Sequence, residues 1–481
     1  MNRRTVLLLL CAALPLSFIQ ADVAQPPAPG EPREVKFTEP VEKTLANGLR
    51  VIVIERRGLP LVSVNLLIKS GAEVDPPELA GLASMTAGLL TRGTAQRSAT
   101  KIAADIEALG AQIDTEAGWD ATSASLAVLA SHAPEALDIL ADVVRAPSFS
   151  KEEVERVRLE TLDELRVSLE EPRTVALAAA QRAIFGTGPY AHPLVGTPGS
   201  VARISREALV QLHATHYRPA NAVLVFAGEL TSAQGFEWAE KVFGDWKNPA
   251  DPLPARRTSE GTPEPRVVVI DMPNAGQSAV VVARPGITRD APDYIAGLAA
   301  NGILGNGYTS RLNVEIRIKR GLTYGAKSVL HALNQPGPFL AYAQTKNPAA
   351  IEVARLVHGE LDRLATAQVS ADELTPRVST LTGDYSRGLE TNEGVAKVVG
   401  ELAVHGRPFT ELNTFTRDAR AVKPDAIQQF AREHFRSAES TLVIAGRLKD
   451  FRKALGDAFT NAEIIPQREL DLDTPSFRKR R

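Results

Sequence analysis

The chain has 481 residues, of which 44% are hydrophobic and 23% are charged, and its formal net charge is −2. This composition is typical of a soluble globular protein, and the length allows two or more domains. Because the charge is nearly balanced, the whole chain offers no electrostatic reason to bind nucleic acid or an anionic membrane surface.

The first residues predict a secretory signal peptide at 1–24. A short basic stretch at 1–4 precedes an apolar run from Thr5 to Ile19, and small residues follow at Ala21 and Ala24. The apolar run is too short to span a bilayer comfortably, and its flanks are typical of a signal that is removed on export. We therefore expect an exported, periplasmic protein. A buried N-terminal helix and a lipoprotein signal at Cys11 are the alternatives.

Cys11 is the only cysteine of the chain. If the signal is removed, no disulfide can stabilise the mature protein, so a large packed core must do so. No later run approaches the length of about 18 apolar residues that a membrane helix needs. We therefore expect no membrane span in the mature chain.

A Pro-rich leader at 25–35 precedes a first domain that is predicted at 36–246. Apolar runs at 49–54 and 62–68 indicate antiparallel strands with one buried face, because polar residues alternate with apolar ones in the second run.

Helices and strands alternate after these two runs. Ser98 is expected to begin a helix that Gly110 ends, and a strand at 124–130 and a helix at 133–144 follow. Strands in hairpins between helices favour an α+β fold over a parallel α/β sheet.

The second half of the chain repeats the first. The segment "HYRPANAVLVFAGEL" at 216–230 resembles "HFRSAESTLVIAGRL" at 434–448, and "FSKEEVERV" at 149–157 resembles "VSADELTPRV" at 369–378. Two matches in the same order at nearly equal spacing predict two homologous domains.

Proline-rich residues separate the two predicted domains. The segment 247–265 contains five prolines and little apolar character, which predicts an interdomain linker. The second domain is then expected at 266–461. A tail at 462–481 follows, and its last four residues, all basic, are interpreted as a solvated terminus.

Several motifs resemble the insulinase/pitrilysin family of inverted zinc peptidases, which includes mitochondrial processing peptidase. They are "NGLRVIVIE", "SGAEVDPPELAGLA", "GLLTRGT", "FGTGPYAHPLVGT" and, in the second half, "GILGNGYTSRLNVEIRIKRGLTYGA". The resemblance covers residues 36–460. It implies two homologous domains, each a mainly antiparallel sheet flanked by helices.

The zinc motif of that family is missing from this chain. The family uses H-x-x-E-H, in which two histidines on one helical face bind zinc and the glutamate deprotonates the bound water. The resemblance places Ser84, Ala87 and Gly88 at these positions, and Glu164 at the position of a later glutamate ligand. A hydroxyl is a poor zinc ligand, and alanine and glycine offer none. We therefore expect no metal in this chain.

The histidines offer no replacement for the missing ligands. They are His132, His192, His213, His216, His331, His358, His405 and His434. His213 and His216 are the only close pair, and His434 occupies the corresponding place in the second half, which favours a structural role. The sequence also gives Ser84 no nearby partner for nucleophilic catalysis.

The second half keeps a different element of the family. In active relatives an arginine and a tyrosine reach the metal site and stabilise the developing oxyanion, and the resemblance places Arg317 and Tyr324 at these positions. As plain structural residues they would be a solvated arginine and a packed tyrosine. The glycine-rich stretch at 301–310 lacks the ending of a phosphate loop.

The pattern resembles one subunit of split bacterial members of the family. We expect a non-catalytic subunit of a heterodimeric zinc endopeptidase, inactive alone, which supplies Arg317 and Tyr324 to a zinc-bearing homologue. It would bind peptide substrates along a sheet edge. The alternatives are a non-enzymatic peptide-binding or scaffold protein of the same fold, and an active peptidase with an unorthodox site.

Overall fold

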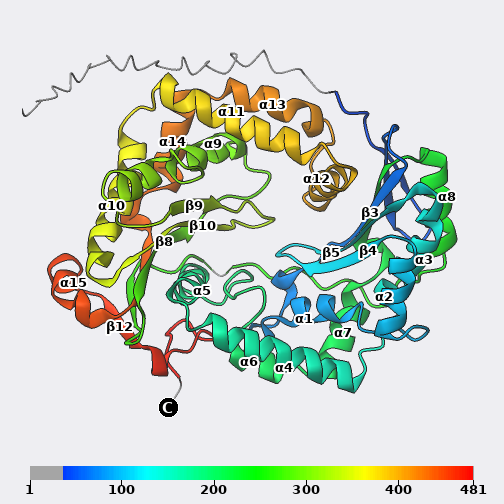
Figure 1. Cartoon of the computed structure of the whole chain (residues 1–481), viewed down its shortest axis with the longest axis horizontal. Helices are drawn as coiled ribbons and strands as arrows, with labels where there is room; N and C mark the ends of the chain where they lie inside the picture. Colours follow the sequence, from blue (N-terminus) through cyan, green and yellow to red (C-terminus); the bar gives the residue numbers. More distant parts are fainter. Residues whose placement is uncertain (1–35, 260, 480–481) are drawn as a thin grey trace, which may run out of the picture. The chain divides into compact units, whose positions relative to one another are not determined.

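The computed structural model describes residues 36–259 and 261–479, and the residues from Phe37 onwards form one unit that contains two sheets (Figure 1). The predicted signal peptide and the predicted leader lie outside the described residues. Within the described residues, no helix is both long and apolar enough to cross a membrane.

The first half of the chain builds a six-stranded sheet in the order β1-β2-β6-β3-β5-β4. Only the β2–β6 pair is parallel, and the other neighbours are antiparallel. The strands are β1 (Val41–Thr44), β2 (Arg50–Glu55), β3 (Leu61–Ile68), β4 (Gln112–Ala117), β5 (Thr122–Leu129) and β6 (Ala222–Gly228).

The second half builds a sheet with the order β12-β7-β11-β8-β10-β9. Its pairs are antiparallel except β12–β7 and β7–β11. The strands are β7 (Val267–Asp271), β8 (Gln277–Pro285), β9 (Ala326–Leu330), β10 (Pro338–Lys346), β11 (Thr441–Gly446) and β12 (Glu463–Pro466). From β7 to β9 this order repeats that of β2 to β4 in the first sheet.

Helices surround both sheets. Those of the first half are α1 (Leu82–Leu89), α2 (Ala99–Ala108), α3 (Ala133–Arg145), α4 (Lys151–Ser168), α5 (Pro172–Phe185), α6 (Pro198–Arg203), α7 (Arg206–His216) and α8 (Ser232–Phe243). Those of the second half are α9 (Tyr294–Leu304), α10 (Ala350–Thr366), α11 (Ala371–Gly388), α12 (Asn392–Val404), α13 (Glu411–Ala421), α14 (Pro424–His434) and α15 (Arg452–Ala458).

Shorter helical turns connect these elements. The segment η5 (Asn313–Ile318) is π-helical. The 3₁₀ turns are η1 (Ala72–Val74), η2 (Pro77–Leu79), η3 (Ala130–His132), η4 (Pro219–Asn221), η6 (Asn347–Ala349), η7 (Ser437–Glu439), η8 (Leu448–Asp450) and η9 (Gln467–Glu469).

The repeat detected in the sequence is confirmed by these elements. Helix α7 leads into β6 as α14 leads into β11, and α4 corresponds to α11. The capping chemistry is repeated as well, because the Ser150 hydroxyl accepts from the Glu153 N–H and the Ser370 hydroxyl accepts from the Glu373 N–H. The predicted α+β fold with two homologous domains is therefore confirmed.

Each sheet has one face covered by a helix from the other half of the chain. Helix α5 packs on β8 and β11, and α12 packs on β3 and β6 (Figure 1). Val395, Val399 and Leu402 of α12 are buried with Ile52 and Val225 of the first sheet. A buried side chain of this size stabilises the fold by roughly 1.5–3 kcal/mol, so the two halves hold each other together.

Because each sheet is covered by a helix from the other half of the chain, the prediction that the strands at 49–54 and 62–68 have one buried face is wrong. They form β2 and β3 and run antiparallel, but β6 lies between them. Strand β3 is buried on both faces, including Ser63 and Asn65, rather than on one. The polar face of this alternating strand lies under α12, a helix that comes more than 300 residues later in the sequence.

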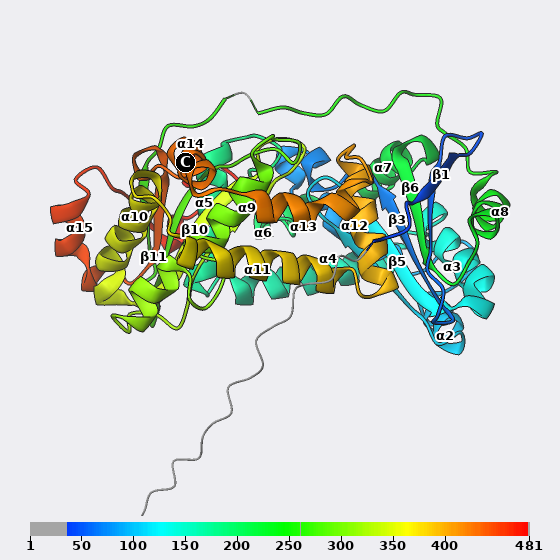
Figure 2. The ribbon, with the colours of Figure 1, turned by 90° about the horizontal axis from the view of Figure 1, so that it is seen from above.

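The residues between α8 and β7 run from one sheet to the other, as Figure 2 shows, and the described ones contain neither helix nor strand. Arginines hold this segment to the first half. Arg257 donates hydrogen bonds to the Asp75 carbonyl at 3.0 Å and the Thr187 carbonyl at 2.9 Å. The segment is therefore attached along its course.

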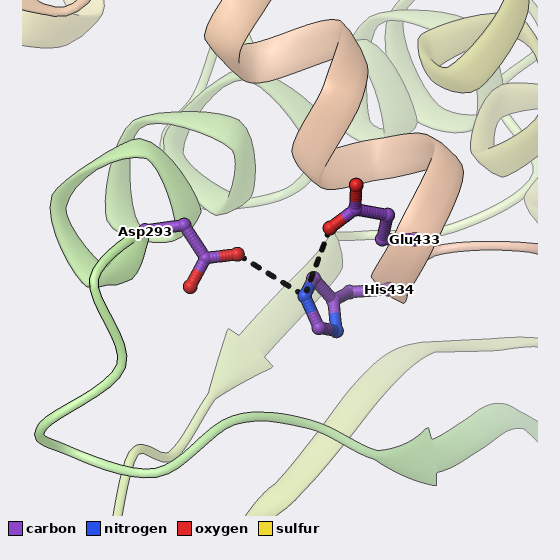
Figure 3. Close-up of side chains that lie close together, drawn as sticks. All are labelled: Asp293, Glu433 and His434. Atoms are coloured by element: carbon purple, nitrogen blue, oxygen red, sulfur yellow. Dashed lines mark hydrogen bonds and ion pairs between the residues drawn. The ribbon is translucent and has the colours of Figure 1, made fainter.

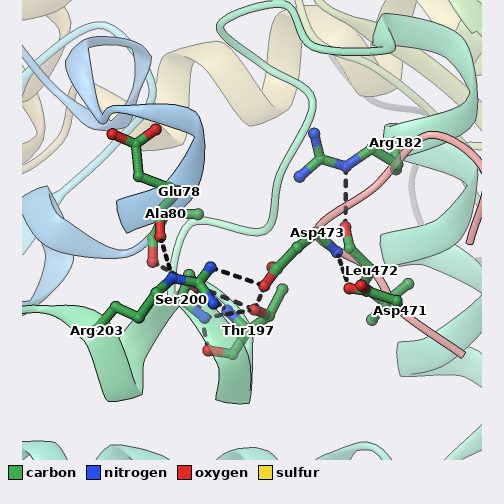
Figure 4. A network of polar contacts seen from close by, with 9 residues as sticks. All are labelled: Glu78, Ala80, Arg182, Thr197, Ser200, Arg203, Asp471, Leu472 and Asp473. Atoms are coloured by element: carbon green, nitrogen blue, oxygen red, sulfur yellow. Dashed lines mark hydrogen bonds and ion pairs between the residues drawn. The ribbon is translucent and has the colours of Figure 1, made fainter. Parts of the chain in front are cut away.

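The residues at 462–479 also belong to the packed structure. Strand β12 extends the second sheet, and Leu472 and Phe477 are buried against it and α5. Figure 4 shows the polar contacts of this segment. Asp473 accepts from the Thr197 hydroxyl at 2.5 Å and from Arg203 at 2.9 Å, and the Leu472 carbonyl accepts from Arg182 at 2.9 Å. The segment thus ties α5 and α6 to the second half.

Candidate functional site

Helix α1 carries Ser84, Ala87 and Gly88, the three positions that the family resemblance assigns to the zinc ligands and the catalytic base. It begins after Gly81, where the Asp75 carboxylate accepts hydrogen bonds from the N–H groups of Gly81 and Ala83, both at 2.9 Å. A carboxylate here satisfies N–H groups that have no partner within the helix and complements the helix dipole. The start of the helix is therefore fixed by a residue six positions upstream of Gly81.

The side chains at these positions do not fit a zinc ion. The Ser84 hydroxyl donates to the Leu194 carbonyl at 2.6 Å, so its proton is already engaged. Ala87 is buried, and its carbonyl accepts from the Thr115 hydroxyl of β4 at 2.8 Å. Gly88 is partly exposed, and an added Cβ there would meet no atom within 4 Å. The three positions therefore offer no zinc donor, and position 88 leaves room for a side chain.

Glu164, the candidate for the later carboxylate ligand, lies on α4, which packs against α1. Its side chain is exposed and forms no hydrogen bond or ion pair with any residue the structure describes. One carboxylate on a solvent-facing helix cannot retain zinc by itself, because structural and catalytic zinc sites use three or four protein ligands.

Arg317 and Tyr324 lie in and after η5. Tyr324 is 88% exposed, and Arg317 is partly exposed, with its guanidinium 4.9 Å from the centre of the Tyr308 ring. Within the described chain, neither side chain bonds to a residue of α1 or α4. Tyr324 is therefore open to solvent, and Arg317 is partly so.

The histidines singled out in the sequence have structural contacts. The His213 imidazole bonds to the Val144 carbonyl at 2.8 Å and stacks on Tyr217, and His216 bonds to the Ser70 hydroxyl at 3.0 Å. Burial lowers the pKa of His213, and it lowers that of His216 to about 4. Both imidazoles are therefore neutral near pH 7 and hold α7 to its surroundings.

His434 lies beside two carboxylates. Its Nε2 atom is 3.1 Å from Asp293 and 3.9 Å from Glu433. Figure 3 shows the three side chains together. Among the described residues this is the one group with three potential metal ligands close together. The short contact with Asp293 is an ordinary hydrogen bond or ion pair between α14 and the start of α9, which pack together. The cluster is explained as a link between two helices.

A cavity of about 890 Å³ lies between the first sheet and α12. Strand β4 forms the edge of that sheet, and its side chains Gln112, Asp114 and Glu116 line the cavity. The opposite wall includes Lys397 and His405, which belong to α12 and to the position directly after it. An edge strand offers unpaired N–H and C=O groups, so an extended peptide could add to it.

Asp120 joins the two halves at this cavity. Its carboxylate accepts from the Tyr190 hydroxyl at 2.5 Å and from the Asn334 N–H at 2.7 Å. His405 approaches it at 4.0 Å and bonds to the Asn334 side chain at 3.1 Å. Burial, and next the Asp120 carboxylate, raise the pKa of nearby Glu73 to about 8. The wall of the cavity is therefore a buried polar network.

Sequence reasoning missed this network and strand β4. The alternation of polar Gln112, Asp114 and Glu116 with Ile113 and Ala117 was a usable strand signal. The partners of Asp120 had no such signal, because Tyr190 is 70 residues away and Asn334 is 214 residues away.

These features define an α+β protein with two homologous domains and a cavity of about 890 Å³. Two family models match it: "Insulinase (Peptidase family M16)" at residues 50–198 and "Peptidase M16 inactive domain" at residues 203–379. The chain belongs to the insulinase (M16) family.

Several relatives and solved structures are similar over most of the chain. An uncharacterised zinc protease of Streptomyces coelicolor is 26% identical, covering 85% of this chain and 89% of the relative. A probable mitochondrial-processing peptidase subunit beta of Arabidopsis thaliana is 23% identical, covering 85% and 78%.

Among solved structures, a peptidase M16 inactive domain from Pseudomonas fluorescens has a TM-score of 0.80 at 27% identity, covering 85% of this chain and 98% of that one. A protease from Helicobacter pylori has a TM-score of 0.81 at 20% identity, covering 85% and 100%, and this second likeness bears on the fold alone.

Proposed function

We propose that this chain is the zinc-less subunit of an exported, two-subunit metalloendopeptidase. The observation that supports this most is a contrast within the chain. The positions that the resemblance gives to the zinc ligands and base hold Ser84, Ala87 and Gly88. Those that it gives to the transition-state donors hold Arg317, which is partly exposed, and Tyr324, which is exposed. The zinc would belong to a homologous partner that carries H-x-x-E-H, and the signal at 1–24 would send the chain to the periplasm.

In this proposal the two donors act on a peptide held in the partner's site. The guanidinium of Arg317 and the phenol of Tyr324 would donate to the carbonyl oxygen that becomes negatively charged in the transition state. A donor placed at such an oxygen typically contributes a factor of roughly 10² to 10³ in rate. Strand β4, an edge strand whose side chains line the cavity, would hold an extended stretch of the peptide.

Reconstitution tests the proposal. The purified chain alone is expected to hold no stoichiometric zinc and to cleave no peptide, and a zinc-bearing homologue from the same organism should gain activity when mixed with it. Arg317→Ala and Tyr324→Phe should each lower that activity by tenfold or more. Arg320→Ala is the matched control, because Arg320 is a neighbouring cation that already pairs with Glu315.

Unchanged activity in both variants would overturn the proposed role of the pair. A tightly bound zinc and hydrolysis by the isolated chain would instead support an active peptidase with an unorthodox site.

One observation favours a second function, a peptide-binding or scaffold protein that needs no partner. Both walls of the cavity come from this one chain, so the cavity is complete without another subunit. A pull-down from the periplasm separates the two functions. Recovery of a zinc-bearing homologue supports the subunit, and recovery of peptides without such a homologue supports the binding protein.

A further inference from the structure

We infer that Tyr308 is a positioning residue for Arg317: its ring holds the guanidinium in place and leaves the N–H groups free for an oxygen ligand from outside the chain. This inference deepens the proposed function and rests on it. It also gives a role to the glycine-rich stretch at 301–310, which neither the zinc motif nor the Arg317 and Tyr324 pair explains.

The other charged residues around η5 pair with one another, and the side chain that Arg317 contacts is Tyr308. Glu315 is the acidic residue of this turn, and it accepts from Lys319 at 2.8 Å and from Arg320 at 2.5 Å. The guanidinium of Arg317 forms no ion pair or side-chain hydrogen bond within the described ranges. Its contact is the face of the Tyr308 ring, 4.9 Å from Cζ to the ring centre. A guanidinium stacked on a ring keeps the N–H groups at its rim available for hydrogen bonds.

The glycines determine where Tyr308 lies. A Cβ on Gly305 would lie 2.2 Å from the backbone nitrogen of Ser328 in β9. Any residue other than glycine would therefore clash at position 305. Gly307 has φ +137, a conformation that side chains with a Cβ rarely adopt. These two residues turn the chain sharply after α9 and bring Tyr308 next to η5.

Hydrogen bonds fix the backbone around the tyrosine. The Asn313 side-chain amide donates to the Tyr308 carbonyl, and Arg377 donates to the hydroxyl of Thr309. The Ser310 hydroxyl donates to the Gly307 carbonyl at 2.7 Å. Tyr308 is 63% exposed, so burial of its side chain stabilises this conformation little. The turn instead brings the ring into contact with Arg317.

The helical turn that carries Arg317 is also unusual. The Lys319 N–H donates to the Val314 carbonyl at 2.9 Å, which is the wider hydrogen bond of a π-helix. Such turns insert one extra residue, redirect the side chains that follow, and are found often at functional sites. The π-helical turn η5 carries Arg317, and the turn that contains Gly305 and Gly307 places Tyr308 against its guanidinium.

The test compares Tyr308→Leu, which removes the ring, with Tyr308→Phe, which keeps it. In the full-length chain labelled at arginine, NMR should show the Arg317 Nε–H signal shifted by the ring current, with Arg317→Lys identifying the signal. Tyr308→Phe should keep that shift and Tyr308→Leu should lose it. Titration with acetate, as a carboxylate probe, should need roughly threefold to fivefold more acetate in Tyr308→Leu, as expected for losing an exposed cation–π contact.

An Arg317 signal and an acetate titration that are unchanged in Tyr308→Leu would overturn the inference. With a zinc-bearing homologue, Tyr308→Leu should lower kcat several-fold with little change in KM, and Tyr308→Phe should restore it. If Arg317→Ala leaves cleavage unchanged, the proposed function fails, whereas the NMR comparison still decides whether Tyr308 positions Arg317. The two failures are therefore distinguishable.

Discussion

Residues 84, 87 and 88, the positions that the family resemblance assigns to the zinc motif, have three different environments. Ser84 is held by a carbonyl of the loop before α6, and Ala87 is packed against β4. Gly88 alone faces open space. The helix is therefore retained as part of the core, since most of its residues are buried, while the groups that would bind a cation are gone.

Glu73 makes stability depend on pH. Burial, and next the Asp120 carboxylate, raise its pKa from about 4.5 to about 8, so the folded chain binds a proton that the unfolded chain releases. The stabilising effect of this proton is complete below pH 4.5 and is lost as the pH rises to 8. Glu73→Gln should remove a slope of about 1.4 kcal/mol per pH unit over this window.

The measurement is the free energy of unfolding in urea at several pH values between 5 and 8. The variant should gain stability relative to the wild type as the pH rises. His216→Gln is a control of opposite sign, because the pKa of His216 is lowered to about 4 and its contribution is lost as the pH falls below 6.5. A parallel pH dependence in Glu73→Gln and the wild type would contradict the assignment.

For single residues, the sequence predicts the chemistry of each side chain but does not predict which residues it contacts. That Ser84, Ala87 and Gly88 are poor zinc donors follows from their chemistry alone. That the Ser84 hydroxyl bonds to Leu194 could not be predicted, because the carbonyl comes from a loop 110 residues later. Burial of Glu73 depends likewise on packing that only the folded chain specifies.

Among the elements, α12 has the largest effect on the first sheet. It turns β3 from a strand with one solvent face into a fully buried one, and its Gly400 lies directly on Leu67. A Cβ at Gly400 would be 2.3 Å from the end of the Leu67 side chain. This close approach makes the contact sensitive to volume.

Gly400→Leu should destabilise the chain by about 1–3 kcal/mol or more, because overpacking displaces the helix from the sheet. Gly359→Leu is the matched control, since Gly359 lies on α10 with no atom near its missing Cβ. A helix interior favours leucine over glycine, so the control should be neutral or stabilised by up to about 1 kcal/mol. Equal effects in the two variants, measured by urea unfolding, would argue against the tight contact.

Helix α1 can be tested by restoring its donors. The triple variant Ser84→His, Ala87→Glu and Gly88→His should hold close to one zinc per chain after gel filtration, because position 88 has room for a side chain and α4 brings Glu164 nearby. Adding Glu164→Gln should weaken zinc binding by at least tenfold. A triple variant with no more zinc than the wild type would show that the two helices no longer align a metal site.

Element boundaries followed from local signals where those existed. The helix expected between Ser98 and Gly110 is α2, capped by the Ser98 hydroxyl, and the helix at 133–144 is α3. The exchange of α5 and α12 had no local signal, because a helix that is apolar on one face does not specify which sheet it will cover. The extent of β3 was predictable from the run at 62–68, and its pairing with β6 and its second buried face were not.

For the whole molecule, the segment after β12 fastens the second half to the first. Its Asp473 carboxylate bonds to Thr197 and Arg203, and Ser200 of the same helix donates to the Ala80 carbonyl at 2.8 Å, next to the start of α1 (Figure 4). A contact near the end of the chain thus reaches the residues directly before α1.

Asp473→Ala should lower the free energy of unfolding by roughly 1–3 kcal/mol, because it leaves partly buried donors without their acceptor. Hydrogen exchange should rise at α6 and at residues 80–84. Glu469→Ala is the control, since Glu469 pairs with the exposed Arg478 and such a pair contributes about 1 kcal/mol or less. If exchange at α6 is the same in both variants, the segment does not hold α6 in place.

The exchange of α5 and α12 has a consequence for how the chain is made. The ribosome completes α5 roughly 90 residues before β8 and about 250 before β11, the strands that will shelter it, and the first sheet emerges long before α12 exists to close over it. A nascent chain that ends in the linker therefore exposes the apolar sheet face that α12 later buries. The first half can complete its packing only when translation is nearly finished.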